Sequence, residues 1–225
     1  MKWNKLYKYP KSIREMVEGK RHYAIDNNKL PSVTTILSAT QSQEKQDSLK
    51  KWIAKVGEEE AERVKNTAAT RGTKMHSILE GYIEDKNILD MTEEGGEAHR
   101  MANTIIDRGL KDLDEIWGSE AVLSYQDRYA GATDLCGIYM GRESIIDFKQ
   151  SNKPKREEWI DDYYLQSAAY ALAHNETYGT EIDQGVILMC TPDCFFQRFI
   201  INGRRFREYT EKWKQKVEEY YAKKG

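Results

Sequence analysis

Apolar residues recur along this chain with two different spacings, and the change from one to the other divides the sequence. Between residues 44 and 116 they return every three or four positions, as Leu49, Trp52 and Val56 do, which predicts amphipathic helices. Later stretches contain short apolar runs bounded by turn residues, which predict strands. We expect helices at 44–66, 72–85, 94–116, 156–175 and 204–222, and strands at 119–127, 131–140, 143–149, 184–191 and 195–201.

The segment before the first long helix predicts a small hairpin and a capped helix. Residues 21–30 read as two short strands that turn at Asp26-Asn27-Asn28. Pro31 then ends the second strand, and Ser32 can N-cap a short helix over residues 33–37. The complete order is helices followed by βββ-α-β-β-α, and we find no internal repeat or linker in it.

A length of 225 residues suits a single domain, in which residues 1–116 are mainly helical and residues 117–225 carry the sheet. Apolar residues make up 39% of the chain, which is enough for a core, and no apolar run approaches the roughly 20 residues of a membrane span. The first residues lack the apolar centre of a signal peptide and contain acidic residues that a transit peptide avoids. We therefore expect a soluble, cytoplasmic protein without membrane contact.

The formal net charge is −2, but the charges are unevenly distributed. Residues 1–75 hold 16 Lys and Arg against 9 Asp and Glu, so the acidic excess lies in the remainder of the chain. A basic N-terminal third can face the phosphates of a nucleic acid while the rest forms ordinary solvated surface. Random scatter of charge is the alternative explanation.

Residues 131–149, GATDLCGIYMGRESIIDFK, carry the strongest candidate for chemistry. They predict two strands joined by a turn at Gly141-Arg142. Residues two apart on a strand point to the same face, so Asp147 and Lys149 share a face that Asp134 on the neighbouring strand can reach. Buried charges are costly unless they are paired or hold a metal. Two carboxylates suit Mg²⁺, and a lysine beside it can orient water or neutralise charge on a phosphate, which is the chemistry of phosphodiester cleavage.

The hairpin pattern, G-x-x-D followed by D-F-K, resembles the PD-(D/E)XK nucleases and, among them, the RecB-type branch. Upstream, His76 in R-G-T-K-M-H is similar to the helical histidine of that branch. Downstream, Gln166 and Tyr170 match its Q-x-x-x-Y motif, and L-P-S-V-T-T-I-L at 30–37 resembles mitochondrial and phage members. A single D-x-K is common by chance, whereas this ordered set is specific. The likeness covers roughly residues 30–221.

This resemblance implies an α+β fold of three layers, in which a PD-(D/E)XK core with a mixed central sheet is flanked by helices and extended by an N-terminal helical elaboration. It implies Asp134 and Asp147 as ligands of Mg²⁺ or Mn²⁺, with His76 and the backbone carbonyl of Phe148 as further ligands. Glu120 is a candidate for contact with a second metal or with water. The imidazole nitrogen would favour Mn²⁺ alongside Mg²⁺. A core histidine and a solvated glutamate are the alternatives.

The resemblance also implies Lys149 as the catalytic lysine. Gln166 would then hydrogen-bond this lysine or the DNA backbone, and Tyr170 would pack beneath it or contact a phosphate. A plain core stripe is the alternative for that helix face. Ser151 and Lys153 stand where relatives touch the cleaved strand.

Basic residues on the helices around His76 are implied as DNA contacts, because a member of this branch passes single-stranded DNA through an arch at the equivalent place. With Trp52 nearby, they would form an electrostatic path with stacking. The acidic run at 58–60 favours the alternative of a solvated helical face. The predicted contacts are Lys50, Lys51, Lys55, Arg71 and Lys74.

The sequence therefore predicts a metal-dependent DNA exonuclease that acts on single-stranded ends, in DNA replication, repair, recombination or phage DNA metabolism. We expect no iron–sulfur cluster, since Cys136, Cys190 and Cys194 cannot supply the four cysteine ligands that some relatives use. The rivals are a duplex exonuclease of the phage lambda kind, a flap endonuclease, and a catalytically silent nucleic-acid-binding subunit. The sequence leaves the polarity of digestion and the oligomeric state open.

Overall fold

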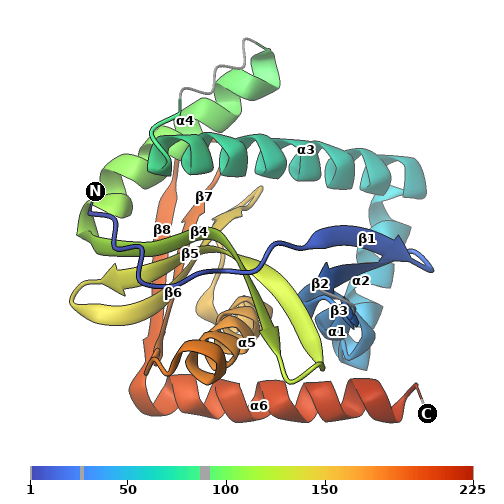
Figure 1. Cartoon of the computed structure of the whole chain (residues 1–225). Helices are drawn as coiled ribbons and strands as arrows, with labels where there is room; N and C mark the ends of the chain where they lie inside the picture. Colours follow the sequence, from blue (N-terminus) through green and yellow to red (C-terminus); the bar gives the residue numbers. More distant parts are fainter. Residues whose placement is uncertain (1, 26–27, 87–91, 225) are drawn as a thin grey trace.

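A five-stranded mixed sheet lies between two layers of helices in the computed structural model, which describes residues 2–25, 28–86 and 92–224 (Figure 1). The helices are α1 (Val33–Ala39), α2 (Gln43–Val56), α3 (Glu58–Ile83), α4 (Glu93–Arg108), α5 (Asp161–Tyr178) and α6 (Gly203–Ala222). The strands are β1 (Ile13–Val17), β2 (Lys20–Ile25), β3 (Asn28–Pro31), β4 (Leu113–Tyr125), β5 (Tyr129–Tyr139), β6 (Arg142–Gln150), β7 (Gln184–Cys190) and β8 (Phe196–Asn202). Helices α3 and α4 cover one face of the sheet, and α5 and α6 cover the other.

The central sheet runs in the order β4-β5-β6-β7-β8. Strands β4, β5 and β6 pair antiparallel in succession, whereas β6 and β7 are parallel because α5 crosses over between them. The turn between β5 and β6 is Met140-Gly141, one residue earlier than the predicted Gly141-Arg142. Both turn residues have positive φ, 51° and 75°, which suits the twist of a two-residue hairpin, and glycine supplies one of these angles without strain.

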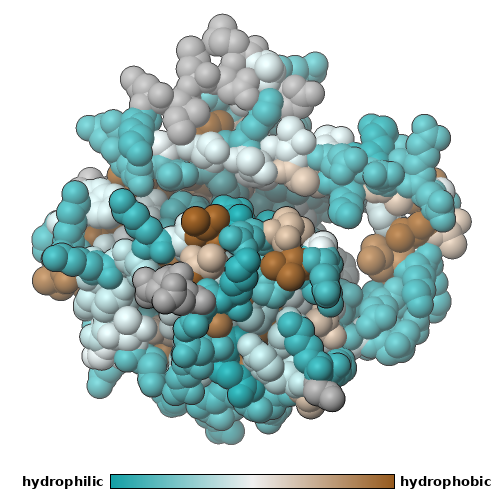
Figure 2. All heavy atoms as spheres, turned by 45° about the vertical axis from the view of Figure 1, so that its right-hand side comes forward, coloured by the Kyte–Doolittle hydropathy of each residue, from teal (hydrophilic) through white to brown (hydrophobic). Residues whose placement is uncertain are grey.

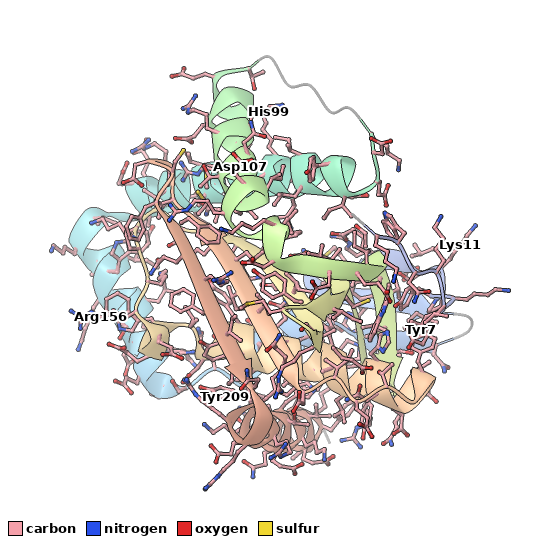
Figure 3. The ribbon with its side chains drawn as sticks, turned by 90° about the vertical axis from the view of Figure 1, so that its left-hand side faces the viewer. Tyr7, Lys11, His99, Asp107, Arg156 and Tyr209 are labelled. Atoms are coloured by element: carbon pink, nitrogen blue, oxygen red, sulfur yellow. The ribbon has the colours of Figure 1, made fainter. Side chains whose placement is uncertain are left out.

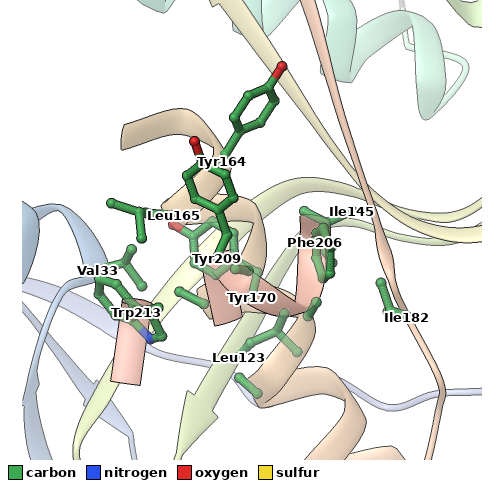
Figure 4. Close-up of a cluster of buried hydrophobic side chains, with 14 of the residues drawn as sticks. Val33, Leu123, Ile145, Tyr164, Leu165, Tyr170, Ile182, Phe206, Tyr209 and Trp213 are labelled. Carbon is green, nitrogen blue, oxygen red and sulfur yellow. The ribbon is translucent and has the colours of Figure 1, made fainter. Parts of the chain in front are cut away.

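Alternation along β6 sends neighbouring side chains into two separate hydrophobic cores. Ile145 packs in the core of α5 and α6, together with Tyr164 and Trp213 (Figure 4). Ile146 and Phe148 pack against α3 and α4 on the opposite face. Seen from the side of β7 and β8, α4 lies above the sheet and α6 below it (Figure 3). The central strands are therefore buried on both faces, as is usual for a sheet with parallel pairing.

The second sheet has three strands in the order β1-β2-β3 and packs on the N-terminal end of β5. Tyr23, Ile25 and Leu30 form a small core with Ala130 of β5. Strand β1 was not predicted, because its sequence, IREMV, shows no apolar alternation and is largely exposed. This sheet is therefore an addition to the mainly helical N-terminal part that the sequence suggested.

The predicted hairpin near residues 21–30 is confirmed as β2 and β3, although residues 26–27 of its turn lie outside the described residues. The predicted cap is confirmed as well, since Ser32 Oγ accepts a hydrogen bond from the backbone N–H of Thr35 at 3.0 Å. This bond satisfies one of the free donors at the start of α1.

Helix α2 and the first half of α3 form an arm, residues 43–70, that extends from the rest of the molecule (Figure 1). None of the α2 residues is buried, and Trp52 is 38% exposed. Figure 2 shows an opening between this arm and the rest of the molecule, with hydrophobic side chains on the arm beside the opening.

Three predicted helix boundaries were wrong, the ends at residues 66 and 116 and the start at residue 72. The chain breaks at Gly57, whose φ of 89° favours glycine, and α3 then runs without interruption through residues 67–71, where we expected a gap. Ala68 and Ala69 are good helix formers, so this segment continues the helix. The predicted helix 94–116 ends at Arg108, and β4 starts at Leu113 after a short 3₁₀ turn.

The predicted fold class is confirmed: a mixed α+β architecture with a five-stranded mixed sheet, flanking helices and a further N-terminal sheet with helices. Within the described ranges, no helix combines the length and apolar character that crossing a membrane requires.

Candidate active site

The site begins where β5 and β6 separate. Their pairing ends with Leu135 opposite Ile146, so Asp134 and the facing part of β6 have no ladder bonds to each other. The Asp134 side chain replaces the missing backbone partner, because its Oδ2 accepts a hydrogen bond from the N–H of Phe148 at 2.7 Å. This contact fixes the carboxylate at the open end of the hairpin.

Gly131 in the G-x-x-D motif leaves room for an aromatic ring. A Cβ at this position would lie 2.7 Å from Cε1 of Tyr170 and 2.9 Å from its hydroxyl oxygen. The Tyr170 hydroxyl accepts a hydrogen bond from Nε2 of Gln166 at 3.3 Å. Tyr170 of the Q-x-x-x-Y motif therefore packs on β5 three residues before Asp134, and Gln166 bonds to Tyr170. The predicted contact of Gln166 with Lys149 or with the DNA backbone stays a prediction.

Three side chains from α3, β4 and β5 converge at this end of the sheet. His76, Glu120 and Asp134 bring one ligand atom each within 4.8 Å of one another, and His76 Nδ1 lies 3.2 Å from Asp134 Oδ1. The β4–β5 register places Glu120 across from Asp134, between two regular pairs. Glu120 has a positive φ of 47°, a local distortion in the middle of β4. The predicted strand 119–127 would place Glu120 near its start, whereas β4 already begins at Leu113.

The three side chains interact strongly through their charges. Loss of solvation and the charges of Asp134 and Glu80 raise the pKa of Glu120 to about 7. Glu120 itself is exposed, and the Asp134 carboxylate that faces it across the two strands repels its charge. Burial lowers the pKa of His76, but the charge of Asp134 and the hydrogen bond to it outweigh burial and raise this pKa. The cluster is a site that attracts a cation.

Asp147 and Lys149 form an ion pair beside this cluster. Asp147 is 3% exposed, and its Oδ2 lies 2.5 Å from Lys149 Nζ. Burial, helped by the charge of Asp134, raises the pKa of Asp147 to about 6 against the opposing effect of Lys149. Burial lowers the pKa of Lys149, but Asp147 and Asp134 outweigh burial and raise it. The Lys149 ammonium also lies 5.2 Å from the ring centre of Tyr163, so it is held on two sides.

All these groups line one open pocket of about 690 Å³. The sheet forms its floor, α3 contributes five residues between Gly72 and Glu80 on one side, and α1 and the small sheet contribute another wall. The pocket thus lies between α1 and α3, the two helices that α2 connects.

The residues of the cluster fit a divalent cation. One imidazole nitrogen and two carboxylate oxygens suit Mg²⁺ or Mn²⁺, and a dication would relieve the repulsion between Glu120 and Asp134. The geometry brings Glu120, which the sequence suggested only as an additional contact, into the same group as His76 and Asp134. Asp147 lies outside this group, and its role as a ligand, like that of the Phe148 carbonyl, stays a prediction.

Some of the predicted DNA contacts are exposed. Lys50, Lys51 and Lys55 lie on the surface of α2, and Lys153 lies on the surface after β6. None of the four forms an ion pair with another residue in the part of the chain that the structure describes. They stay predicted contacts.

Arg71 has different surroundings, because it is only 7% exposed. Its guanidinium donates hydrogen bonds to Glu97 at 2.8 Å, Gln150 at 3.1 Å and Asn152 at 2.5 Å. These bonds connect α3, α4 and the segment after Lys149. The Arg71 guanidinium is therefore already bonded inside the protein, and its role as a DNA contact stays a prediction.

Two other predicted contacts also have partners within the protein. Lys74 donates a hydrogen bond to Thr92 at 2.8 Å. The buried Ser151 hydroxyl donates to the carbonyl of Lys153 at 2.7 Å, which shapes the loop after β6. Their roles as DNA contacts stay predictions.

Several residues of the pocket were missed in the sequence. Glu80 lies four residues after His76 on α3, a spacing that places both on one helix face and could have revealed it. Arg14 and Arg21 line the pocket from the small sheet. No pattern marked Arg14, because β1 itself has none.

Comparison with known proteins identifies relatives at low sequence identity, and no family model matches the chain. The chain is 25% identical to mitochondrial genome maintenance exonuclease 1 of Homo sapiens over 209 residues, which is 89% of this chain and 60% of that protein. The identity to the Mus musculus protein is 27% over 212 residues, 88% of this chain and 61% of that protein. The chain thus spans about three fifths of the length of these relatives.

Among solved structures, a crystal structure of a candidate exonuclease from Eubacterium rectale has the same fold. Its TM-score is 0.51 at 15% sequence identity, with 70% of this chain and 65% of that chain covered. The sequence likeness extends over most of the chain, and the fold likeness covers more than two thirds of it. The chain is a distant homologue of mitochondrial genome maintenance exonuclease 1.

Proposed function

We propose that this protein is a metal-dependent DNA exonuclease that hydrolyses phosphodiester bonds at single-stranded ends. The observation that carries the proposal is the convergence of His76, Glu120 and Asp134 beside the Asp147–Lys149 ion pair in one open pocket. The names of the relatives add the exonuclease class. We further propose that residues 1–225 act as one nuclease unit, because the pocket draws its walls from both halves of the chain.

The side chains of the pocket have separate tasks in this proposal. A divalent cation, Mg²⁺ or Mn²⁺, held by His76, Glu120 and Asp134 and by Asp147 as a further ligand would polarise the phosphate and lower the pKa of water. Lys149 can hold the attacking water or stabilise charge that develops on the phosphate oxygens, since its ammonium is fixed in the pocket.

The arm supports the choice of single-stranded ends. Helix α2 connects the end of α1 to the start of α3, and the pocket lies between α1 and α3. A strand that enters the pocket from this side passes beneath the arm, where Lys50, Lys51 and Lys55 can contact phosphates. Trp52 adds an aromatic surface on which bases can stack. A path closed by a helix favours a substrate with a free end.

The test is digestion of 5′- and 3′-labelled DNA with Mg²⁺, with Mn²⁺ and with EDTA. We expect metal-dependent release of nucleotides from linear single strands and resistance of a circular single strand. Asp134→Asn, which keeps the shape of the side chain but removes its charge, serves as the inactive control. Preferred digestion of duplex ends would favour the lambda kind of enzyme, and nicking of circles or flaps would favour an endonuclease. Binding without any cleavage would favour a silent nucleic-acid-binding subunit.

A further inference from the structure

Two arginines of the small sheet face the same pocket as the metal cluster. In the β1–β2 register Arg14 is opposite Tyr23 and Arg21 is opposite Met16, so both arginines lie on one face of the sheet. Arg14, Arg21 and Tyr23 all line the pocket. Both arginine side chains are exposed, and neither forms a hydrogen bond or ion pair through its guanidinium with a residue that the structure describes.

The backbone at Arg21 is held in place by the start of α1. Its carbonyl accepts two hydrogen bonds, from the N–H of Ser32 at 3.0 Å and from the hydroxyl of Thr35 at 2.8 Å. Ser32 and Thr35 are buried, and their hydroxyls lie 2.9 Å apart. Both belong to the L-P-S-V-T-T-I-L segment, for which the proposed function gave no task. Its polar residues fix the strand that carries Arg21 against the pocket.

The charges of the pocket show why these arginines differ from its other cations. Lys149 is paired with Asp147, and the pocket residue Asp162 is paired with Lys45 at 2.8 Å. Arg14 and Arg21 have no such carboxylate partner within the described residues, although Arg14 is close enough to Glu120 to interact with its charge. The pocket therefore has one wall that attracts a metal cation and another that attracts an anion.

We propose that Arg14 and Arg21 form a subsite for a backbone phosphate adjacent to the one that is cleaved. The planar guanidinium donates two parallel hydrogen bonds to a phosphate, and these charge-assisted bonds are among the strongest in proteins. The ligand is thus a DNA strand with at least two consecutive phosphodiesters at this end of the pocket. The subsite rests on the proposed function, because it defines how the same substrate lies in the same pocket.

The first experiment compares a DNA strand with a substrate that has only one phosphodiester, bis(4-nitrophenyl) phosphate. Removing a hydrogen bond to a charged group costs about 1.5–3 kcal/mol, so Arg14→Ala and Arg21→Ala should each raise KM for the strand roughly tenfold or more. The kcat for the strand and both constants for the small substrate should stay near the wild-type values. Lys20→Ala is the matched control, since Lys20 lies beside Arg21 on the opposite face of β2. Arg→Lys variants should recover only part of the affinity.

The second experiment locates the phosphate. A neutral methylphosphonate is placed at one position after another along the strand. In the wild type, one position beside the cleavage site should weaken binding, and in the double Arg14→Ala, Arg21→Ala variant that position should have no further effect. Equal losses in both proteins at every position, or an unchanged KM in the arginine variants, would overturn the subsite.

Strand binding without metal, measured by fluorescence anisotropy, separates the subsite from the proposed function. If no substrate is cleaved but the methylphosphonate effect depends on the arginines, the nuclease proposal fails and the phosphate subsite stands. If cleavage is normal and binding does not depend on them, the subsite fails alone. Thermal melting should show that the variants are folded, because neither guanidinium has a hydrogen-bond or ion-pair partner among the described residues.

Discussion

Helices α2 and α5 were both expected from the sequence, at 44–66 and 156–175, but their surroundings differ completely. Helix α5 lies between the central sheet and α6, and nine of its residues are buried. Helix α2 has no buried residue, although Leu49, Trp52 and Val56 repeat on one face. Apolar spacing therefore predicts that a segment is helical, whereas it does not predict what covers the apolar face.

The two helices also differ in the residues that they place near the pocket and the arm. Because α5 is held between the sheet and α6, it places Tyr163 beside Lys149 of β6 and Tyr170, with its partner Gln166, against Gly131 of β5. The apolar face of α2 lies beside the opening under the arm, together with lysines that have no partners within the described ranges. We infer that α5 positions the chemistry and that α2 contacts the substrate.

The largest effect on activity is expected from Lys149, whose ammonium lies against Tyr163 of α5. Lys149→Ala should reduce kcat on the order of 10³-fold, as removal of a charge that stabilises the transition state typically does. Metal binding, measured by calorimetry, should persist, because His76, Glu120 and Asp134 remain. Loss of both activity and metal binding would show that Lys149 has a structural role, since it would then be needed to keep the buried Asp147 in place.

The next prediction compares a tryptophan of the core with one of the arm. Trp213 on α6 is 0% exposed and packs edge-to-face on Tyr129 at 5.0 Å between ring centres. Trp213→Ala should lower the free energy of unfolding by about 3–5 kcal/mol, as loss of a buried aromatic ring usually does. Trp52→Ala should change it by less than about 0.5 kcal/mol, which is typical of surface positions. Denaturant unfolding measures both.

The outcome for Trp52 decides whether the comparison holds. A large loss of stability in Trp52→Ala would mean that the apolar face of α2 is covered in solution. A stable Trp52→Ala variant with a raised KM for single strands would support contact with bases instead.

The sequence predicted the core of the fold well because the information there is local. Two apolar runs separated by a turn in residues 131–149 mark β5 and β6, and the capping residue Ser32 marks the start of α1. The start of β4 was missed, since Leu113 and Ile116 also fit the helical spacing of the preceding segment. The exposed strand β1 has no regular spacing of apolar residues, so the small sheet could not be predicted in full.

The sequence marked residues of the candidate site, but it did not show which of them lie together. The order of motifs marked His76, Asp134, Asp147 and Lys149, and the structure brings all four into one pocket. Glu120 and Asp134 lie close to His76 because the backbone is distorted at Glu120, with φ of 47°, and because β5 separates from β6 at Asp134. Neither feature is visible in the sequence. The intramolecular bonds of Arg71 depend equally on distant partners.

A smaller effect on stability is expected from the buried His174 near the C-terminal end of α5. His174 is 0% exposed, and burial lowers its pKa to about 4. In the unfolded chain the pKa of His174 is about 6.5, so between pH 4 and 6.5 the unfolded state binds more protons than the folded state. The contribution of His174 to the free energy of unfolding is thus complete above pH 6.5. It falls as the pH drops toward 4, by at most about 2 kcal/mol at pH 5. Urea unfolding from pH 7.5 to 5 should show this loss, and His174→Asn should show a shallower dependence on pH.

The smallest change concerns the substrate contacts of α2. Reversing the charge of Lys50, Lys51 and Lys55 to Glu should raise KM for linear single strands several-fold and weaken the salt dependence of binding. Each lost phosphate contact lowers the salt slope by roughly 0.7 for single strands. The kcat should stay close to the wild type, because these residues lie on the arm and not in the pocket. The triple Lys→Arg variant, which keeps the charge, should behave like the wild type, so a loss in both variants would point to a damaged arm. If KM and salt dependence are unchanged in the Glu variant, α2 carries only a solvated face, and its uncovered apolar stripe has no role in holding DNA.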